Sequence, residues 1–167
     1  MITVRPATLD DVPQVLPMVE KISNLHRKWD ADRFTIKPDV GTLYAQWLPQ
    51  RVDDAQSVFL VAQREDGVTG NGAIVGYLIA TVEEELPIYW LPECGYIHDI
   101  WVEPEYRHEG AARQMVLLAV ERFTQLGVKQ VRLETAAVND TGRALFAACG
   151  FRPATVEMMC VIEKVGP

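Results

Sequence analysis

Apolar positions along the chain follow two different periods, and the order of these periods predicts the order of its elements. Spacing of three or four residues predicts helices that begin near Asp10 and at Gly110, and shorter helices over 40–48 and from Asn139 onward. Short β-prone runs predict strands over residues 2–5, 57–63, 73–82, 96–102, 129–136 and 155–162. Strands that first follow one another and then alternate with helices indicate an α/β fold. The expected fold has a mixed central sheet of about six or seven strands and helices on both faces.

Prolines and a polar stretch interrupt the N-terminal third of the chain. Pro17 lies inside the first helical stripe and is expected to kink or split that helix, and Pro49 is expected to end the next one. Residues 25–39 are polar and aromatic without a period and are expected to be irregular, and residues 66–72 to form a glycine-rich turn. No linker divides the chain, so residues 1–167 are expected to form a single domain.

Length and composition exclude several classes of protein. The 167 residues are 49% hydrophobic and 23% charged, which is a globular balance. A chain of this length buries about 68–70% of its unfolded surface and needs no metal or disulfide. The net charge of −7 repels phosphate backbones, so nucleic acid is not an expected partner, whereas cationic small molecules or basic peptides are favoured. No apolar run approaches the ~20 residues that span a membrane.

The three cysteines, Cys94, Cys149 and Cys160, cannot all pair and show no Cys-x-x-Cys spacing. They are expected to be reduced thiols that serve as small core residues in a cytoplasmic protein. The N-terminus lacks the charged-then-apolar layout of a secretion signal, which also predicts a cytoplasmic location.

Residues 102–113 hold the pattern with the clearest chemical meaning. An apolar strand ends at Val102, a polar turn contains Arg107, and an amphipathic helix opens at Gly110. The first N–H groups of a helix have no intrahelical acceptor and carry partial positive charge, and a glycine lets an anion approach them. The segment therefore fits a phosphate-binding turn, although the pattern alone fits an ordinary strand–helix turn equally well.

Two motifs resemble those of the Gcn5-related N-acetyltransferase (GNAT) family. The first, an Arg/Gln-x-x-Gly-x-Gly/Ala turn after an apolar strand end, is matched by Val102, Arg107, Gly110 and Ala112. The second, an Asn followed by a helix that ends in Gly-Phe, is matched by Asn139 and residues 143–151. The similarity covers nearly the whole chain and is densest over 96–151. It implies the GNAT fold, in one N-acetyltransferase domain.

The resemblance implies acetyl-CoA as the cofactor. Its diphosphate is expected over the amides of residues 108–113 and its pantetheine arm along the strand end at 100–102, with Asn139 in contact with that arm. For Arg143 two interpretations stay open, a place near the cofactor and a solvated helix charge. The expected cofactor-binding residues are Ile100, Trp101, Val102, Arg107, His108, Glu109, Gly110, Ala111, Ala112, Arg113, Asn139, Arg143 and Phe146.

Two positions depart from the family pattern. The Glu109 carboxylate is unfavourable beside a diphosphate, so we expect it to point to solvent while its N–H still contributes. Phe146 stands where many relatives have a tyrosine that protonates the departing CoA thiolate. Either water or another hydroxyl supplies the proton in its place, or the thiolate leaves without one. The CoA thiol has a pKa not far above neutral, so its departure as a thiolate is chemically tolerable.

His98 and Asp99 are the candidate catalytic residues, because they are the titratable pair beside the expected thioester. An amine must lose a proton before it attacks, and an imidazole with a pKa of about 6.5 suits that task. The strand resembles the Leu-Glu-Asp strand of the family's diamine acetyltransferases, with His98 in the glutamate position. Strict alternation puts His98 on the face of Ile100 and Val102, opposite Asp99. A purely structural role for His98 stays open as an alternative. For Asp99 two roles stay open, orienting the amine and capping a neighbouring loop.

Acidic and aromatic residues elsewhere are candidates for an acceptor site, with a solvated loop tip and ordinary packing as the alternatives. They are Trp29, Asp30, Asp32, Glu83, Glu84, Glu85, Tyr89 and Trp90.

The predicted function is acetyl transfer from acetyl-CoA to a primary amine, by direct attack in a ternary complex without an acetyl-cysteine. The expected acceptor is a small cationic molecule. The alternatives are a protein N-terminal or lysine acetyltransferase, a non-catalytic acyl-CoA-binding regulatory module, and an interaction domain with no ligand. A homodimer is compatible with the sequence.

Overall fold

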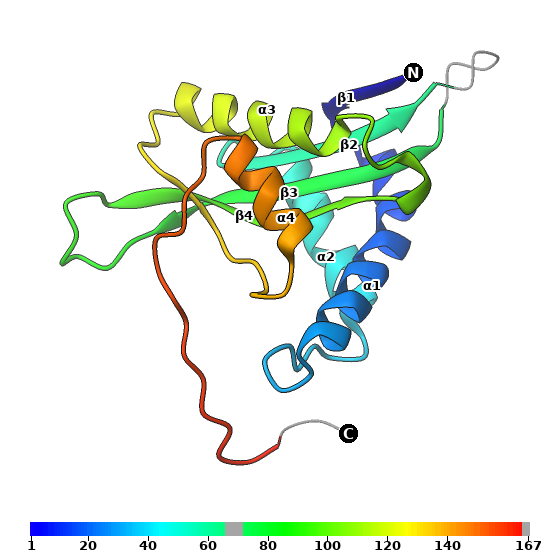
Figure 1. Cartoon of the computed structure of the whole chain (residues 1–167). Coiled ribbons are helices and arrows are strands. Elements are labelled where there is room, and N and C mark those ends of the chain that lie inside the picture. Colours follow the sequence, from blue (N-terminus) through cyan, green and yellow to red (C-terminus); the bar gives the residue numbers. More distant parts are fainter. Residues whose placement is uncertain (66–71, 165–167) are drawn as a thin grey trace.

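A five-stranded mixed sheet forms the centre of the protein in the computed structural model, which describes residues 1–65 and 72–164 (Figure 1). The strands lie in the order β1-β2-β3-β4-β5; the first four are antiparallel, and β5 runs parallel to β4. Their bounds are β1 (Ile2–Pro6), β2 (Ser57–Arg64), β3 (Ile74–Glu84), β4 (Glu93–Val102) and β5 (Val131–Leu133). The expected α/β fold with a mixed sheet is confirmed.

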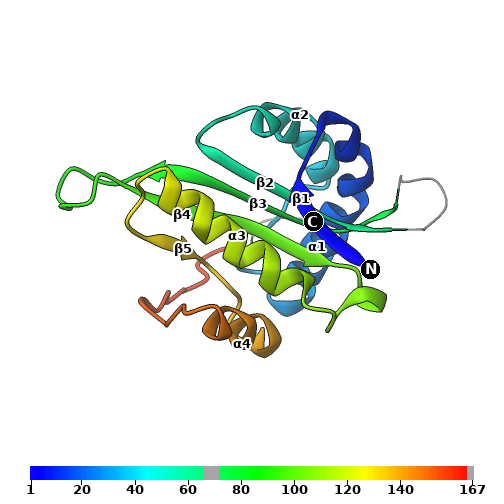
Figure 2. The same cartoon turned by 90° about the horizontal axis from the view of Figure 1, so that it is seen from above.

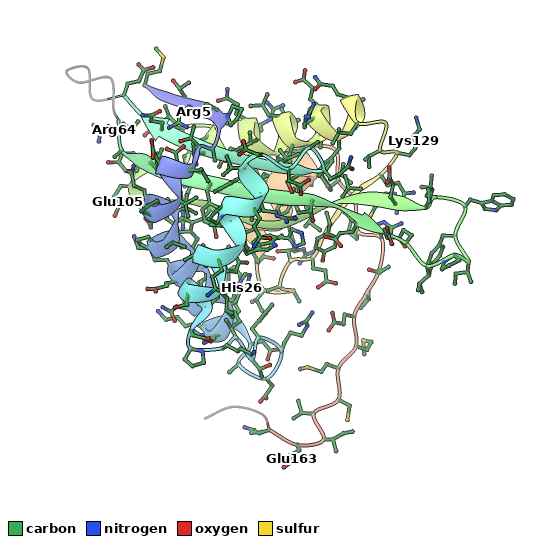
Figure 3. All side chains as sticks on the ribbon, turned by 180° about the vertical axis from the view of Figure 1, so that it is seen from behind. Arg5, His26, Arg64, Glu105, Lys129 and Glu163 are labelled. Carbon is green, nitrogen blue, oxygen red and sulfur yellow. The ribbon has the colours of Figure 1, made fainter. Side chains whose placement is uncertain are left out.

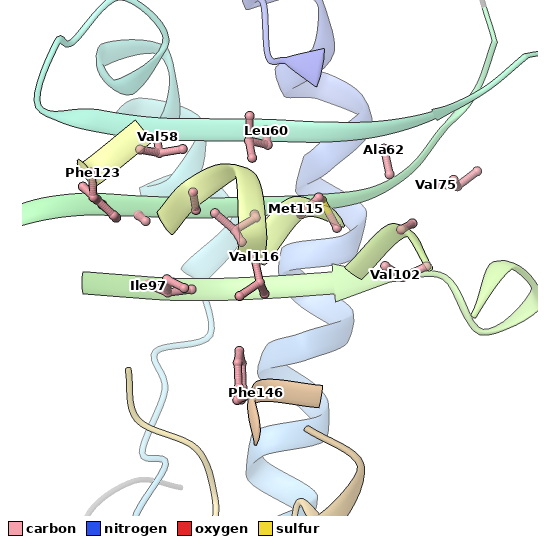
Figure 4. Close-up of a cluster of buried hydrophobic side chains, with 14 of the residues drawn as sticks. Val58, Leu60, Ala62, Val75, Ile97, Val102, Met115, Val116, Phe123 and Phe146 are labelled. Atoms are coloured by element: carbon pink, nitrogen blue, oxygen red, sulfur yellow. The ribbon is translucent and has the colours of Figure 1, made fainter. Parts of the chain in front are cut away.

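Helices cover both faces of the sheet, as expected (Figure 2). One face packs against α1 (Val12–Trp29) and α2 (Val40–Val52), and the other against α3 (Ala111–Gln125) and α4 (Asp140–Ala148). Alternate strand residues feed two separate cores, because successive side chains of a strand point to opposite faces. The core beneath α3 and α4 includes Val58, Leu60, Ile97, Met115, Val116, Phe123 and Phe146 (Figure 4).

Neither proline breaks its helix. Pro17 lies inside α1 and Pro49 inside α2, which continues to Val52. The region 25–39 is accordingly irregular only after Trp29. The apolar stripe of α1, with Val15 and Val19 fully buried, outweighs the loss of one backbone hydrogen bond at Pro17.

The expected strand over 155–162 is wrong, so the sheet has five strands where six or seven were expected. The segment is exposed and has no strand neighbour among the residues that the structure describes. A β-prone sequence forms a strand only where another strand supplies hydrogen-bond partners, and this segment has none in the described ranges 1–65 and 72–164. The glycine-rich turn over 66–72 lies almost entirely outside the described residues. No helix within the described ranges is both long and apolar enough to cross a membrane.

Candidate active site

A β-bulge at His98 sets the geometry of β4. Ile79 of β3 lies opposite Asp99, but the next residue, Ala80, lies opposite Ile97, so His98 has no partner on β3. A bulge places one extra residue in a strand and breaks the alternation of its faces.

The bulge overturns the expectation that His98 and Asp99 lie on opposite faces. The His98 ring packs edge-on against Trp47 of α2, and Asp99 accepts a hydrogen bond from Tyr44 of the same helix. The core beneath α3 receives their neighbours Ile97, Ile100 and Val102 instead. Two titratable side chains therefore share the face that α1 and α2 cover.

The same bulge leaves backbone groups of β4 at an open edge. β5 pairs with only three residues of β4, and no strand in the described part of the chain lies beside residues 98–102 on that edge. Alternate residues of a strand direct their N–H and C=O groups to opposite neighbouring strands. The N–H of Gly95 donates toward β5, but the N–H of Glu103, also an odd-numbered residue, donates toward β3. The alternation therefore shifts by one residue between them. After the bulge, the N–H and C=O groups of Ile100 and Val102 point to the open edge.

The loop before α3 forms a cradle of unpaired amides. His108 and Gly110 have positive φ angles of 68° and 85°, and the first helical bond runs from the Gln114 N–H to the Gly110 carbonyl. The N–H groups of residues 108–113 have no acceptor among the described residues. A Cβ built on Gly110 meets nothing within 4 Å. The turn therefore has both the donors and the room for an anion.

Arg107 joins this cradle to the strand. Its Nε donates to the Val102 carbonyl over 2.9 Å, and its guanidinium lies 4.8 Å from the centre of the Trp101 ring. Since the Trp101 and Val102 side chains are buried, only their backbone is available to a ligand. The Glu109 side chain is exposed, as the sequence predicted.

Asn139, which is expected from the sequence to contact the pantetheine arm, also has a structural role. Its Oδ1 accepts from the Gly142 N–H and its Nδ2 donates to Thr135 Oγ1, both over 3.0 Å, so it caps α4. A Cβ on Gly142 would lie 2.3 Å from Asn139 Nδ2, so this cap requires glycine there. Arg143 is exposed and donates to the Ala137 carbonyl, which favours its interpretation as a surface charge that stabilises the loop before α4.

Phe146 is an apolar wall. It is 8% exposed and its ring contacts that of Phe151 at 5.8 Å between centroids. In Figure 4 it stands on α4, on the far side of the Ile97–Val102 strand from Leu60. No proton is available from this side chain.

His98 lies in a short hydrogen-bonded chain with Thr81 and Glu83. Thr81 Oγ1 donates to Glu83 Oε1 over 2.5 Å and lies 2.6 Å from His98 Nε2. A hydroxyl has one proton, and a carboxylate accepts it; His98 Nε2 must then be the donor to Thr81. That assigns the basic lone pair to Nδ1. Burial lowers the pKa of His98, against the opposing effects of Glu83 and Asp99, so the ring is neutral at pH 7.

Asp99 belongs to a more deeply packed group. The Tyr44 hydroxyl donates to its Oδ2 over 2.6 Å. Burial raises the pKa of Asp99, although the Tyr44 bond and the neighbouring His26 and His98 act to lower it. Burial likewise raises the pKa of Tyr44 and lowers that of His26. The Tyr44 bond thus connects β4 to α2 beside the histidine.

Carboxylates also gather where β5 ends. Arg33, in the connection between α1 and α2, pairs with Glu134 over 3.2 Å and with Glu157 over 2.7 Å. Tyr96 lies nearby, and burial together with Glu134 raises its pKa to about 12. Segments that are far apart in sequence therefore meet next to the face that carries His98.

Sequence reasoning missed Tyr44, Thr81 and Arg33. Tyr44 and Trp47 are three residues apart on one face of α2, a signal that was available. The place of Thr81 follows from the shifted register and had no signal in the sequence. Conversely, Tyr89 and Trp90 are exposed and do not line the site.

Comparison with known families and curated proteins gives one assignment. The model described as the acetyltransferase (GNAT) family matches residues 22–151, which is more than half of the chain. A comparison with curated protein sequences finds no match.

Several solved structures share the fold. A variant of the BH1408 protein from Bacillus halodurans superposes with a TM-score of 0.81 at 21% identity, over 96% of this chain and 99% of that one. The aminoglycoside 6'-N-acetyltransferase AAC(6')-Ih from Acinetobacter baumannii superposes with a TM-score of 0.68 at 20% identity, over 99% of this chain and 100% of that one. A protein from Clostridium acetobutylicum, described as a predicted acetyltransferase with acetyl-CoA, gives 0.71 at 18%, over 97% of each chain.

Proposed function

This chain belongs to the acetyltransferase (GNAT) family, and from that premise we propose that it is an acetyl-CoA-dependent N-acetyltransferase whose acceptor is the primary amine of a small cationic molecule. Acetyl-CoA supplies the acyl group as a thioester. The acceptor nitrogen attacks it directly in a ternary complex. A cysteine carrier is not needed, and burial raises the pKa values of Cys94 and Cys149, which makes both poor nucleophiles.

The observation that carries the proposal is the row of unpaired amides at 108–113, next to the open edge of β4. The amides and the helix dipole suit a diphosphate, and the room above Gly110 lets it approach. The outward N–H and C=O groups of Ile100 and the outward N–H of Val102 suit the amides of a pantetheine arm, as an added strand would use them, while the Val102 carbonyl already accepts from Arg107.

His98 is the base in this proposal. Its Nδ1 takes a proton from the acceptor ammonium, directly or through water, and the resulting charge is stabilised by Glu83 through Thr81. Asp99 and its Tyr44 bond are proposed to hold the strand and orient the amine.

A cationic acceptor is supported by the charges around this face. Glu83, Asp99 and Glu134 are carboxylates close to His98 or Tyr96, and the chain has a net charge of −7. The rings of Trp47 and Tyr96, both in contact with His98, add surfaces that attract cations.

One residue favours a second candidate. Phe146 supplies no proton to a leaving thiolate, so an acyl-CoA-binding module without turnover is the alternative. Acetylation of protein N-termini or lysines is the other acceptor class. Turnover on small amines supports the main proposal, and turnover on peptides with a free N-terminus or lysine separates the other two.

The cradle is tested by Gly110→Val and by Gly127→Val as its matched control. Both glycines lie at ends of α3 with φ of 85° and 83°, and a Cβ on either meets nothing within 4 Å. The two variants therefore carry similar backbone strain, but only a side chain at 110 would meet a diphosphate. We expect CoA affinity, measured by calorimetry, to fall at least about tenfold in Gly110→Val and to be retained in Gly127→Val. Equal affinity in both folded variants would remove the cradle from the proposal.

A further inference from the structure

The proposed reaction lacks an evident proton donor for the sulfur of the departing CoA. Phe146 stands where many relatives have a tyrosine, and its ring has no proton to give. The opposite face of the sheet, which lies behind α1 and α2 in Figure 3, has hydroxyl groups near His98 and Asp99. They belong to Tyr44, Tyr77, Thr81 and Tyr96.

Three of these hydroxyls are already engaged or enclosed. The Tyr44 hydroxyl donates to Asp99 over 2.6 Å, and the Thr81 hydroxyl donates to Glu83 over 2.5 Å. Tyr77 is 0% exposed, so a ligand does not reach its hydroxyl. A donor to a leaving group must reach the ligand with a proton to give, and none of these three meets both conditions.

Tyr96, which is only partly buried, lies where β4 and β5 separate. It is paired with Arg132 of β5, and the parallel pairing ends one residue later, at Ile97 with Leu133. Beyond that pair the edge of β4 has no strand beside it in the described part of the chain. The centroid of the Tyr96 ring is 5.2 Å from that of His98. Tyr96 is therefore next to both the proposed base and the start of the opening between the strands.

The surroundings of Tyr96 keep its hydroxyl protonated at pH 7. Burial and the Glu134 carboxylate raise the pKa of Tyr96 to about 12, although Arg33 acts to lower it. The Arg33 guanidinium is itself held by Glu134 and Glu157, at 3.2 and 2.7 Å. A phenol of this kind gives up its proton only while another group replaces it, and the imidazolium of His98 is the neighbouring group that can do so.

We propose that Tyr96 donates the proton to the CoA sulfur and that His98 returns a proton to Tyr96. The inference rests on the proposed acetyl transfer. As the C–S bond breaks, its electron pair stays on sulfur and the hydroxyl proton of Tyr96 moves to that sulfur. The phenolate oxygen then takes the proton that His98 removed from the acceptor, directly or through water.

This sequence balances protons and charge. An ammonium that becomes an amide loses two protons. One of them passes through His98 and Tyr96 and ends on the thiol of CoA, and the other goes to water. Both side chains return to their starting protonation states, so the protein is ready for the next acceptor.

The first test measures the acidity of the thiol of bound CoA and needs no turnover. The complex with CoA is titrated with alkali, and ionisation of the thiol is followed by NMR of the carbon next to the sulfur. A phenol that donates to the sulfur stabilises the thiolate, so the acid dissociation constant of the thiol is expected to fall roughly tenfold in Tyr96→Phe. This variant keeps the ring against His98, so CoA affinity is expected to be unchanged. Tyr89→Phe, at an exposed hairpin position, is the matched control and is expected to behave as the wild type.

The second test moves the phenol to the other face of the sheet. Tyr96→Phe is expected to lower turnover on an accepted amine by at least roughly tenfold, since it removes the proton donor. Adding Phe146→Tyr to that variant places a phenol where relatives carry one and is expected to recover most of the loss. Phe146→Tyr alone shows what the change on α4 itself costs.

The outcomes separate this inference from the proposed function. An active wild type whose bound thiol has the same acidity as in Tyr96→Phe overturns the role of Tyr96 and leaves the acetyl transfer standing. Unchanged turnover in Tyr96→Phe does the same. A wild type that binds CoA but acetylates no amine contradicts the proposed function and the proton transfer with it.

Discussion

His98 receives its orientation from one extra residue in β4. Because it has no partner on β3, its ring lies on the same face as the Asp99 carboxylate and reaches Thr81. The chain His98–Thr81–Glu83 assigns the proton to Nε2 and leaves Nδ1 to accept one. Burial keeps the ring neutral near pH 7 by lowering the pKa of His98.

Replacing His98 by alanine is expected to lower turnover by roughly 10²–10⁴-fold, the usual range for a positioned base. The wild-type rate should rise with pH through the lowered pKa of His98, because only the neutral ring accepts a proton. This limb should be absent from the pH–rate profile of His98→Ala, while CoA affinity is unchanged.

A variant that keeps the histidine makes this test sharper. Glu83 acts to raise the pKa of His98, so Glu83→Gln should move the acid limb to lower pH. Glu84→Gln, an exposed neighbour, should leave the limb in place. If the limb stays where it was in Glu83→Gln, the titrating base is a group other than His98.

The motif residues at this scale were predictable, but the direction of His98 was not. Arg107 and Gly110 act through local backbone geometry, which a short sequence pattern specifies. The bulge depends on how β4 pairs with β3, and no periodicity within β4 alone indicates it.

At the scale of elements, an ion pair joins β1 to the start of α1. Arg5 bonds both oxygens of Asp11, at 2.7 and 2.8 Å, and Thr8 adds two bonds to the same carboxylate. Burial acts to raise the pKa of Asp11, but the bonds from Arg5 and Thr8 outweigh it and hold that pKa below its usual value.

Asp11→Asn is therefore expected to lower the free energy of unfolding by about 1–3 kcal/mol at pH 7, measured in urea. A carboxyl whose pKa is depressed in the folded state stabilises it above the unfolded pKa of about 3.9 and loses that effect as pH falls further. The difference between wild type and Asp11→Asn should therefore shrink below about pH 4. Asp10→Asn, at an exposed neighbour, should have little effect at either pH; a comparable loss there would contradict the specific role of Asp11.

Most helices and strands were predictable because their apolar periods match their burial. The errors arose where tertiary contacts decide. The packed stripe of α1 tolerates Pro17, and residues 155–162 have strand-forming side chains but no strand beside them within the residues that the structure describes. Predicting the first case requires knowing which residues α1 packs against, and predicting the second requires knowing which strand edge lies beside the segment.

At the scale of the whole molecule, the sheet brings the proposed cofactor side and the proposed acceptor side to one strand. The amide cradle and the open edge of β4 lie toward α3 and α4, while His98, Asp99 and the carboxylates lie toward α1 and α2. An acetyl group held at the end of the edge would face an amine held by the acidic side, so the division of the fold matches a two-substrate transfer.

The most direct measurement of this account is the release of CoA from acetyl-CoA, followed with a thiol reagent, across a panel of small primary amines with neutral alcohols as controls. The account predicts acceptor-dependent release with cationic amines, together with formation of the N-acetyl product by mass spectrometry. Tight binding of acetyl-CoA without release in the presence of any of these amines would contradict it and would leave a binding module or a protein acetyltransferase.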